Sequence, residues 1–139
     1  MSTKRIKLTP LMKISTSGGD VLHGLKKNED SFIGYGETYF SLIDYQSIKA
    51  WKMHLEMTLN LIVPIGKVRF VFCDSIEDTS FRVEDIGEEN YSRLTIPPKI
   101  WFGFKGISKK TSLVVNIADL THDDNEVIKK DPKLFKYNW

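Results

Sequence analysis

Short, largely apolar runs recur along the chain, and the first 120 residues contain no sustained helical spacing. The runs are rich in Val, Ile, Phe, Tyr and Thr, and Gly, Pro, Asn and Asp separate them. The eight clearest runs are 37–43, 48–54, 58–63, 68–74, 80–85, 93–96, 100–105 and 112–118. Short strands at spacings of roughly 8–12 residues are typical of an antiparallel sandwich or barrel.

A helical pattern emerges only near the C-terminus. Asp123 or Asp124 provides an N-cap for a short helix that runs through Lys130 and ends at Pro132. With no internal repeat and no low-complexity segment, the pattern predicts one all-β domain over residues 1–139 with a short C-terminal helix.

Composition and charge exclude several classes of protein. The 139 residues carry 20 basic and 18 acidic side chains, a formal net charge of +2, so a nucleic-acid or membrane-surface protein is not indicated. The longest apolar run, 59–65, is broken by Asn60 and Pro64, whereas a membrane span needs about 20 apolar residues. A single cysteine, Cys73, excludes internal disulfides and cysteine-built zinc sites. With no signal peptide at the start, we expect a cytoplasmic protein.

Several predicted strands have apolar residues on both faces, and segment 68–73 is an example. In segment 68–73, both alternating sets of side chains are largely apolar. Such a strand lies inside a sandwich or at a subunit interface. An edge-exchanged dimer and an ordinary core strand both account for it, and the sequence leaves the two alternatives open.

Motifs for phosphate or metal binding are absent. Gly34 and Gly36 lack the third glycine and the following helix that a phosphate-binding loop requires. His23, His54 and His122 stand far apart in the sequence and form no His-x-His or His-Glu-x-x-His pair. We therefore expect no metal site.

The predicted strand 48–54 carries a pair of basic groups. Strand alternation places Lys52 and His54 on one face together with Ile48 and Ala50, and it places Lys49, Trp51 and Met53 on the other face. In a cavity, two neighbouring basic groups depress one another's pKa, as a general base near neutral pH requires. On a solvated face, the same two residues would be an incidental pair of charges.

Several segments resemble a known family in their order and spacing. They are GETYFS at 36–41, IKAWKMH at 48–54, GKV at 66–68, NYSRLTIPP at 90–98, IWFGF at 100–104 and DPKL at 131–134, with Trp139 at the end. Over about residues 36–139 the chain resembles the cupin-type sugar-nucleotide epimerases and ketoisomerases, which include dTDP-4-dehydrorhamnose 3,5-epimerase-like proteins and dTDP-4-keto-6-deoxyglucose 3,4-ketoisomerases. The resemblance implies a cupin-type jelly-roll barrel or sandwich and a homodimer, and the predicted strands agree with that fold.

The resemblance also implies a reaction. Family members remove a proton α to the 4-keto group of a nucleotide-linked 6-deoxysugar, and the enolate is reprotonated on the other face or at the neighbouring carbon. This chemistry needs no cofactor. The implied function is an isomerase or epimerase of nucleoside-diphosphate 4-keto-6-deoxysugars in surface polysaccharide synthesis, such as lipopolysaccharide O-antigen or capsule. The alternative is a non-catalytic cupin that binds a sugar nucleotide or another small carbohydrate.

The family pattern supplies candidate catalytic residues, with departures. Lys52 stands where the family has its catalytic histidine, His54 matches a second histidine, and Lys49 replaces an arginine. Asp131 matches the aspartate that orients the base. The family's acidic tyrosine is expected near Thr121, and no tyrosine is present there. We therefore expect Lys52, His54 and Asp131 to be catalytic, with either Lys52 or His54 as the base.

Further residues are candidates for substrate binding, each with a plainer alternative. They are Tyr39, Lys49, Asn60, Arg93, Trp101, Asn116 and His122. The two aromatic rings either stack on the nucleotide or belong to the core, and the cationic groups either neutralise a diphosphate or are solvated. The two asparagines either contact sugar hydroxyls or satisfy internal hydrogen bonds. His122 lies in a loop, from which it can close over the cavity and replace the missing acid.

Overall fold

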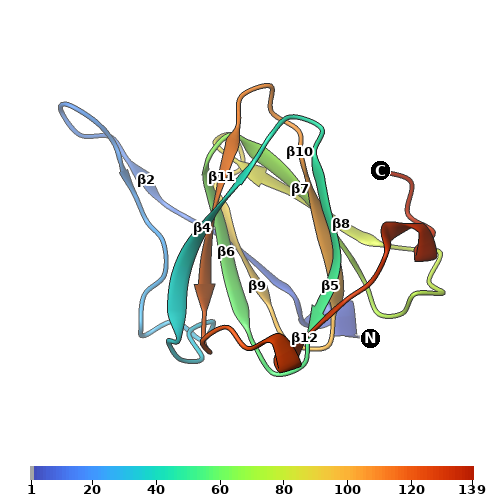
Figure 1. The fold of residues 1–139 in the computed structure, drawn as a ribbon. Coiled ribbons are helices and arrows are strands. Elements are labelled where there is room, and N and C mark those ends of the chain that lie inside the picture. The colour runs from blue at the N-terminus through green and yellow to red at the C-terminus, as the bar shows by residue number, and fades with distance from the viewer. Residues whose placement is uncertain (1) are drawn as a thin grey trace.

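Two antiparallel five-stranded sheets pack face to face in the computed structural model, which describes residues 2–139 (Figure 1). The first sheet has the order β1 (Lys7–Pro10), β9 (Ser92–Ile96), β6 (Leu59–Ile65), β11 (Ser112–Ala118) and β4 (Glu37–Ile43). The second sheet has the order β12 (Val127–Lys129), β5 (Ile48–His54), β10 (Trp101–Gly106), β7 (Lys67–Cys73) and β8 (Arg82–Gly87). The strands β4 and β12 therefore form edges of the two sheets.

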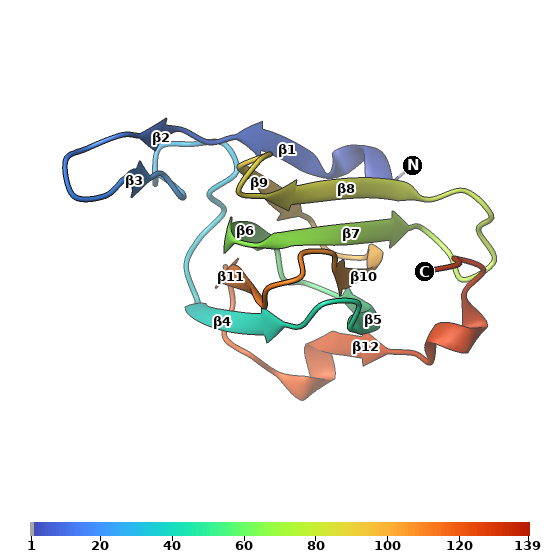
Figure 2. The ribbon, with the colours of Figure 1, turned by 90° about the horizontal axis from the view of Figure 1, so that it is seen from above.

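A small hairpin and three short helices of residues 2–139 lie outside the two main sheets. A hairpin of β2 (Lys13–Ile14) and β3 (Val21–Leu22) projects away from the body of the molecule (Figures 1 and 2). Three short 3-10 helices are present in the described chain: η1 (Ser2–Arg5), η2 (Asp124–Glu126) and η3 (Pro132–Leu134). No helix within residues 2–139 is long and apolar enough to cross a membrane.

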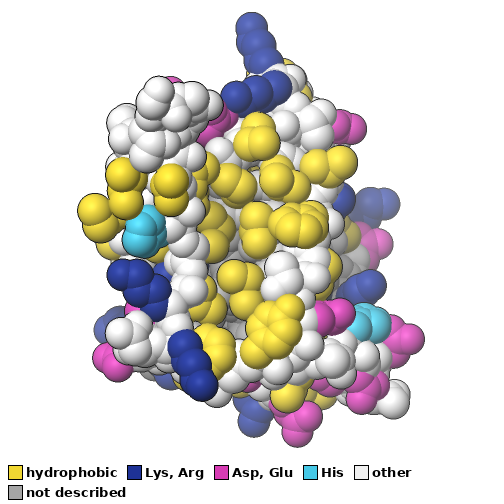
Figure 3. Space-filling view, turned by 90° about the vertical axis from the view of Figure 1, so that its left-hand side faces the viewer, with side chains coloured by type: hydrophobic (Ala, Val, Ile, Leu, Met, Phe, Trp, Pro, Cys, Tyr) yellow, Lys and Arg dark blue, Asp and Glu magenta, His cyan; other side chains and the backbone are white. Residues whose placement is uncertain are grey.

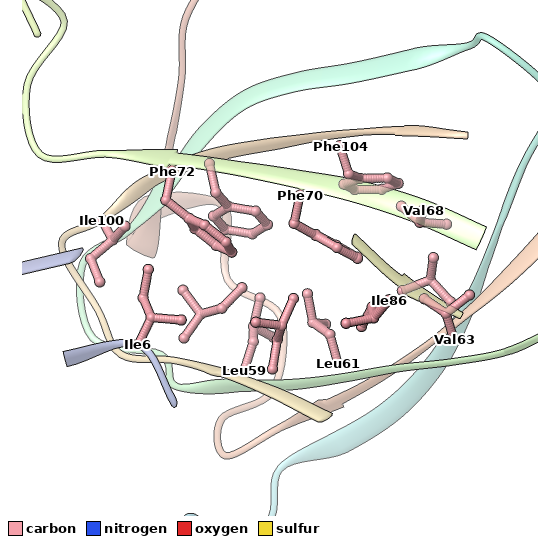
Figure 4. Close-up of a cluster of buried hydrophobic side chains, with 14 of the residues drawn as sticks. Ile6, Leu59, Leu61, Val63, Val68, Phe70, Phe72, Ile86, Ile100 and Phe104 are labelled. Atoms are coloured by element: carbon pink, nitrogen blue, oxygen red, sulfur yellow. The ribbon is translucent and has the colours of Figure 1, made fainter. Parts of the chain in front are cut away.

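The core lies between the two sheets, where the inward side chains of β6 and β7 meet (Figure 4). Phe70 and Phe72 of β7 are fully buried, and Leu61 and Val63 of β6 are at most 1% exposed. The Phe70 ring lies 5.3 Å from the Phe104 ring of β10, centroid to centroid. Burial of each such side chain contributes about 1.5–3 kcal/mol to the free energy of unfolding, so this layer holds the two sheets together.

The all-β jelly-roll prediction is confirmed, and three predicted strands match β4, β5 and β11 residue for residue. The predicted C-terminal helix through Lys130 is wrong in its length. Asp123 does act as a cap, because its carboxylate accepts a hydrogen bond from the Asn125 amide at 2.9 Å, but η2 ends at Glu126. The next three residues do not continue the helix and instead pair with the edge of β5 as β12.

The last residues of the chain cover the outer face of the second sheet (Figure 1). There Val71 and Cys73 of β7 are buried against Trp101 and Phe135. The two-sided apolar character of segment 68–73 is therefore explained within one chain: the C-terminal tail, residues 135–139, takes the place that a partner subunit would otherwise occupy.

Candidate active site

Two adjoining cavities open between the β4 edge of the first sheet and the β12–β5 edge of the second. The larger has a volume of about 350 Å3, and the following residues line it: Glu37, Tyr39, Lys52, His54, Met57, His122, Val127 and Lys129. The second, of about 320 Å3, shares Lys52 and Lys129 with the first and adds Ser41, Lys49, Ala50, Trp51 and Phe104. The structure thus brings four of the predicted site residues, Tyr39, Lys52, His54 and His122, into one cavity.

His54 and Glu126 form a buried pair at the floor of the larger cavity. His54 is the last residue of β5, and its Nδ1 lies 2.5 Å from the Oε1 of Glu126. The other carboxylate oxygen of Glu126 accepts hydrogen bonds from the backbone amides of Glu56 and Met57, at 3.1 and 3.0 Å. The Nε2 of His54 is buried and has no hydrogen-bond partner among residues 2–139. One ring nitrogen is therefore anchored and the other is free.

The surroundings favour a neutral His54 ring. Burial lowers the pKa of His54 below its usual value near 6.5, and this outweighs the opposing effect of the Glu126 carboxylate; Lys52 lowers it further. Burial alone would raise the pKa of Glu126, but hydrogen bonds from His54 and the two backbone amides bring it below its usual value. A neutral imidazole whose Nδ1–H donates to a carboxylate keeps a free lone pair on Nε2, as a general base requires.

A bulge in β5 turns two lysines toward the cavities. In the pairing with β10, Lys52 lies opposite Phe102 and Lys49 lies opposite Phe104, so β5 holds one residue more than its partner strand. Lys49 and Lys52 consequently share the inner face, and the predicted placement of Lys49 on the opposite face is wrong. The Nζ of Lys49 donates to the Leu42 carbonyl of β4 at 2.9 Å.

Lys52 is part of a cluster of ammonium groups. Its Nζ lies 5.4 Å from the centroid of the Phe102 ring. Burial lowers the pKa of Lys52 below its usual value, and the charges of Lys129 and Lys49 add to this effect, while Glu126 opposes it. Three lysines around two joined cavities attract an anionic ligand, because binding an anion relieves their mutual repulsion.

Tyr39 and His122 supply groups that can donate a proton. Burial raises the pKa of Tyr39, and Glu37 and Glu126 raise it further, so the phenol stays protonated. The Tyr39 hydroxyl forms no hydrogen bond within the described chain. His122 lies at the rim, where its Nε2 is 2.8 Å from the Asp124 carboxylate and its backbone amide donates to Glu37. The cavity therefore holds a proton acceptor together with two proton donors.

Asp131, which the sequence predicted as the orienting carboxylate, lies outside both cavities. It is exposed, and its carboxylate accepts a hydrogen bond from the Lys133 amide at 2.9 Å, as the N-cap of η3. The group that contacts the histidine is Glu126. A signal for it is present in the sequence, since Glu126 follows Asp123 at the spacing of a capping box. That spacing predicts a helix start, and the carboxylate instead reaches back to β5.

Asn60 and Arg93, both predicted to bind substrate, lie outside both cavities and are hydrogen-bonded within the chain. Arg93 is completely buried, and its guanidinium donates to Asn60 Oδ1, to the Gly24 carbonyl and to Glu29. The amide nitrogen of Asn60 donates to the Ser31 carbonyl at 3.0 Å. These bonds fix the segment before β4 against the first sheet, away from the cavities.

Two more predicted contacts also lie outside the cavities. Trp101 is buried in the outer aromatic cluster, with its ring 5.3 Å from that of Phe135. Asn116 is buried in β11, and its amide donates to the Ser41 hydroxyl and to the Tyr39 carbonyl of β4. Asn116 therefore supports the strand that carries Tyr39. Sequence reasoning missed several residues that the cavity does contain: Glu37, Met57, Val127, Lys129 and, beneath them, Glu126.

The described residues contain no group of three or more His, Cys, Asp or Glu side chains that could hold a metal ion. The side chains around the larger cavity supply acid–base chemistry of their own. A buried neutral histidine, a carboxylate that orients it, a cationic cluster and proton donors at one cavity of a jelly-roll define a candidate acid–base enzyme.

Comparisons with known proteins agree with this class. No protein-family model matches the chain. A probable low-salt glycan biosynthesis epimerase of Haloferax volcanii is 31% identical over 111 residues, which are 73% of this chain and 71% of that protein. A dTDP sugar isomerase from Desulfovibrio desulfuricans superposes with a TM-score of 0.89 at 32% identity, over 96% of this chain and 90% of the other.

A more distant structure shows the same fold. The sugar 3,4-ketoisomerase of Thermoanaerobacterium thermosaccharolyticum, solved with TDP, superposes with a TM-score of 0.75 at 16% identity, over 93% and 90% of the two chains. The chain belongs to the cupin-type sugar-nucleotide epimerases and isomerases. The resemblance inferred from the sequence is thus confirmed, and the protein is an enzyme of the isomerase class.

Proposed function

We propose that the protein interconverts nucleoside-diphosphate 4-keto-6-deoxysugars by proton abstraction α to the ketone. The observation that carries this proposal is His54, which is held by Glu126 at 2.5 Å while its Nε2 is left free beside the cavity. A non-catalytic cupin, the alternative, would gain nothing from a buried histidine with an unsatisfied ring nitrogen, because such a group costs free energy on folding.

The cavity supplies each step of the reaction. His54 Nε2 takes the proton, and the electrons of the broken C–H bond move onto the carbonyl oxygen to give an enolate. Glu126 stabilises the imidazolium, and the Lys52 ammonium stabilises the enolate oxygen. The Tyr39 hydroxyl returns a proton to carbon, on the other face or at the neighbouring position, with His122 at the rim as the second donor. Proton exchange with solvent then returns the His54 imidazolium to its neutral form and the Tyr39 phenolate to the phenol. In this assignment His54 is the base and Lys52 the oxyanion stabiliser.

The second cavity fits the diphosphate. Lys49 and Lys129 line it together with Lys52 and offer three positive charges to a group that carries two or more negative ones. A relative of the same fold was solved with TDP, which supports a thymidine diphosphate as the first nucleotide to test. Four residues expected to bind substrate are left out of this assignment: Asn60, Arg93, Trp101 and Asn116.

Solvent deuterium incorporation tests the reaction directly. Incubated in D2O with dTDP-4-keto-6-deoxyglucose, the protein is expected to remove the proton NMR signal at C3, because His54 loses the abstracted proton to solvent and the Tyr39 hydroxyl returns a deuteron acquired from D2O. Loss at C3 alone identifies a ketoisomerase or single-centre epimerase, and loss at C3 and C5 identifies a 3,5-epimerase. Binding without exchange across dTDP, UDP, GDP and CDP sugars would contradict the proposal and leave the non-catalytic alternative.

We propose that the protein acts in surface polysaccharide synthesis, such as that of lipopolysaccharide or capsule. The relative in Haloferax volcanii carries a name from glycan biosynthesis, which supports the same kind of process. We propose the cytoplasm as the protein's compartment, which agrees with the free, buried thiol of its single cysteine, Cys73.

We further propose that the protein is a homodimer that buries the outer face of the first sheet. Phe40 and Leu42 of β4 are 66% and 63% exposed. Leu113, Val115 and Ile117 of the neighbouring strand β11 continue the same apolar face and are only partly covered. Figure 3 views this side and shows hydrophobic side chains gathered across it. A contiguous apolar face of this kind is typical of a protein–protein interface.

Charge substitution on this face is expected to produce monomers. Leu42→Glu places a carboxylate at the centre of the proposed interface, where desolvation of the charge opposes association. Sedimentation velocity should show a dimer for the unmodified protein and a monomer for the variant. Val83→Glu is the matched control, because Val83 is an exposed apolar residue of the second sheet, and it should remain dimeric. A monomeric unmodified protein would rule the interface out.

A further inference from the structure

The Trp51 indole lies on the outer face of the second sheet, although its neighbour Lys52 points into the cavities. Trp51 falls within the bulge, between the pairs Lys52–Phe102 and Lys49–Phe104. It is 99% buried in the outer aromatic cluster, where its indole stacks on Phe135 with ring centroids 4.5 Å apart and planes inclined by 15°. Trp51 is thus the residue through which the bulge is anchored on the far side of the second sheet.

The C-terminal segment holds Trp51 by its backbone as well as by its ring. The Trp51 amide donates to the Lys130 carbonyl at 3.3 Å, and the Lys130 amide donates to the Trp51 carbonyl at 3.0 Å. Beyond η3, the Phe135 ring stacks on the indole and the Trp139 ring lies 5.5 Å away. The Lys105 ammonium, which donates to the Trp139 carbonyl, fastens the end of the chain to β10.

Regular strand alternation would undo the arrangement of the lysines. Without the extra residue, Lys49 would lie on the same side of the sheet as Trp51, and only Lys52 would reach the cavity. With the bulge, both ammonium groups line the second cavity. The burial of the indole on the outer face therefore determines which charges the inner face presents.

We propose that Trp51 is a positioning residue: stacked on Phe135, it maintains the bulge that turns Lys49 and Lys52 into the cavity. The C-terminal tail thereby sets the electrostatics of a site with which it has no direct contact. The proposal rests on the proposed function only in assigning Lys49 and Lys52 to ligand binding. The geometry itself can be tested without substrate.

The titration of Lys52 distinguishes an aromatic cluster that only stabilises the fold from one that also positions the lysines. Loosening a piece of core lowers the thermal unfolding midpoint but leaves the titration of Lys52 unchanged as long as β5 keeps its bulge. Loss of positioning moves Lys52 toward solvent and away from Lys49, so its pKa rises toward the usual lysine value, because burial and the neighbouring ammonium groups are what lower it.

The experiment is an NMR titration of lysines labelled as 13C-dimethylamines, with the Lys52 signal assigned from Lys52→Arg. Phe135→Leu keeps an apolar side chain and removes the stacked ring. It is expected to raise the Lys52 midpoint by about half a pH unit or more, a ~3-fold change in the acid constant. Phe81→Leu is the matched control, because Phe81 also borders Trp51, at 6.1 Å and tilted, but belongs to the β7–β8 connection. It should leave the midpoint in place.

A Lys52 midpoint that is the same in Phe135→Leu as in the unmodified protein, or that shifts equally in both variants, would overturn the proposal. Trp139→Ala provides a second variant at the chain end if Phe135→Leu fails to fold. A smaller upward shift is expected for it, and no shift counts against the proposal. Absence of deuterium exchange in D2O together with a shifted Lys52 would refute the proposed function and leave the positioning role intact.

Discussion

Substitution of His54 by asparagine is expected to lower kcat for the isomerisation by about 10²–10⁴-fold, the usual cost of removing a general base. Asparagine preserves the size and a hydrogen bond toward Glu126 but offers no basic nitrogen to the cavity. Because His54 lines the larger cavity and not the one assigned to the diphosphate, the dissociation constant for thymidine diphosphate should change little. Steady-state kinetics followed by NMR and calorimetric titration of the diphosphate measure the two quantities separately.

His23→Asn is the matched control, since His23 directly follows β3 and lines neither of the two cavities. It should retain full activity. Equal losses in His23→Asn and His54→Asn would mean that the effect is one of folding. Full activity in His54→Asn would instead transfer the role of base to Lys52, the other basic group that faces this cavity.

The pH dependence has a defined sign. Because the pKa of His54 lies below its usual value near 6.5, the neutral base persists at neutral pH, and kcat/KM should fall only as the pH drops below that value. In the unfolded chain the same histidine binds a proton near 6.5. The free energy of unfolding should therefore also fall as the pH decreases from 6.5 toward the folded pKa, and His54→Asn should flatten this decrease.

The sequence predicts best the strands whose residues and flanking turns identify them without reference to a distant partner strand. Strand β4 agrees with its prediction residue for residue: its partly buried and exposed positions alternate, Gly36 precedes it and Asp44 follows it. Strand β12 escapes prediction because its three residues carry no periodicity of their own. It forms by pairing with β5, more than 70 residues earlier for each pair, and no local pattern encodes that contact.

The site is predictable to a similar degree. Lys52 and His54 are two residues apart in one strand, so their common face follows from the period of a strand. The bulge that adds Lys49 to this face depends on how β5 pairs with β10, which the sequence does not display. Asn60 and Arg93 show the converse case. An amide inside an apolar strand suggests a sugar contact for Asn60, and a cation suggests a diphosphate contact for Arg93, but the structure gives both residues partners within the chain.

Substitution of Glu126 by glutamine is expected to lower kcat by about 10²–10⁴-fold, although it only replaces one carboxylate oxygen by an NH2 group. The carboxylate accepts from His54 Nδ1 and from two backbone amides. A glutamine amide that keeps an oxygen toward those amides turns its NH2 group toward the ring. The ring then accepts at Nδ1 and carries its proton on Nε2, which is the wrong tautomer for a base. The loss of negative charge also removes the stabilisation of the imidazolium.

Asp131→Asn is the matched control, because Asp131 belongs to the same C-terminal segment and is the carboxylate that the family pattern favours. Its exposed side chain caps η3, so the substitution should leave kcat unchanged and cost about 1 kcal/mol of stability or less. A pH–rate profile completes the comparison: the acid limb that reports His54 should be displaced in Glu126→Gln and retained in Asp131→Asn. The reverse order of effects would mean that Asp131 reaches the base in the working enzyme and that the His54–Glu126 pair serves only the fold.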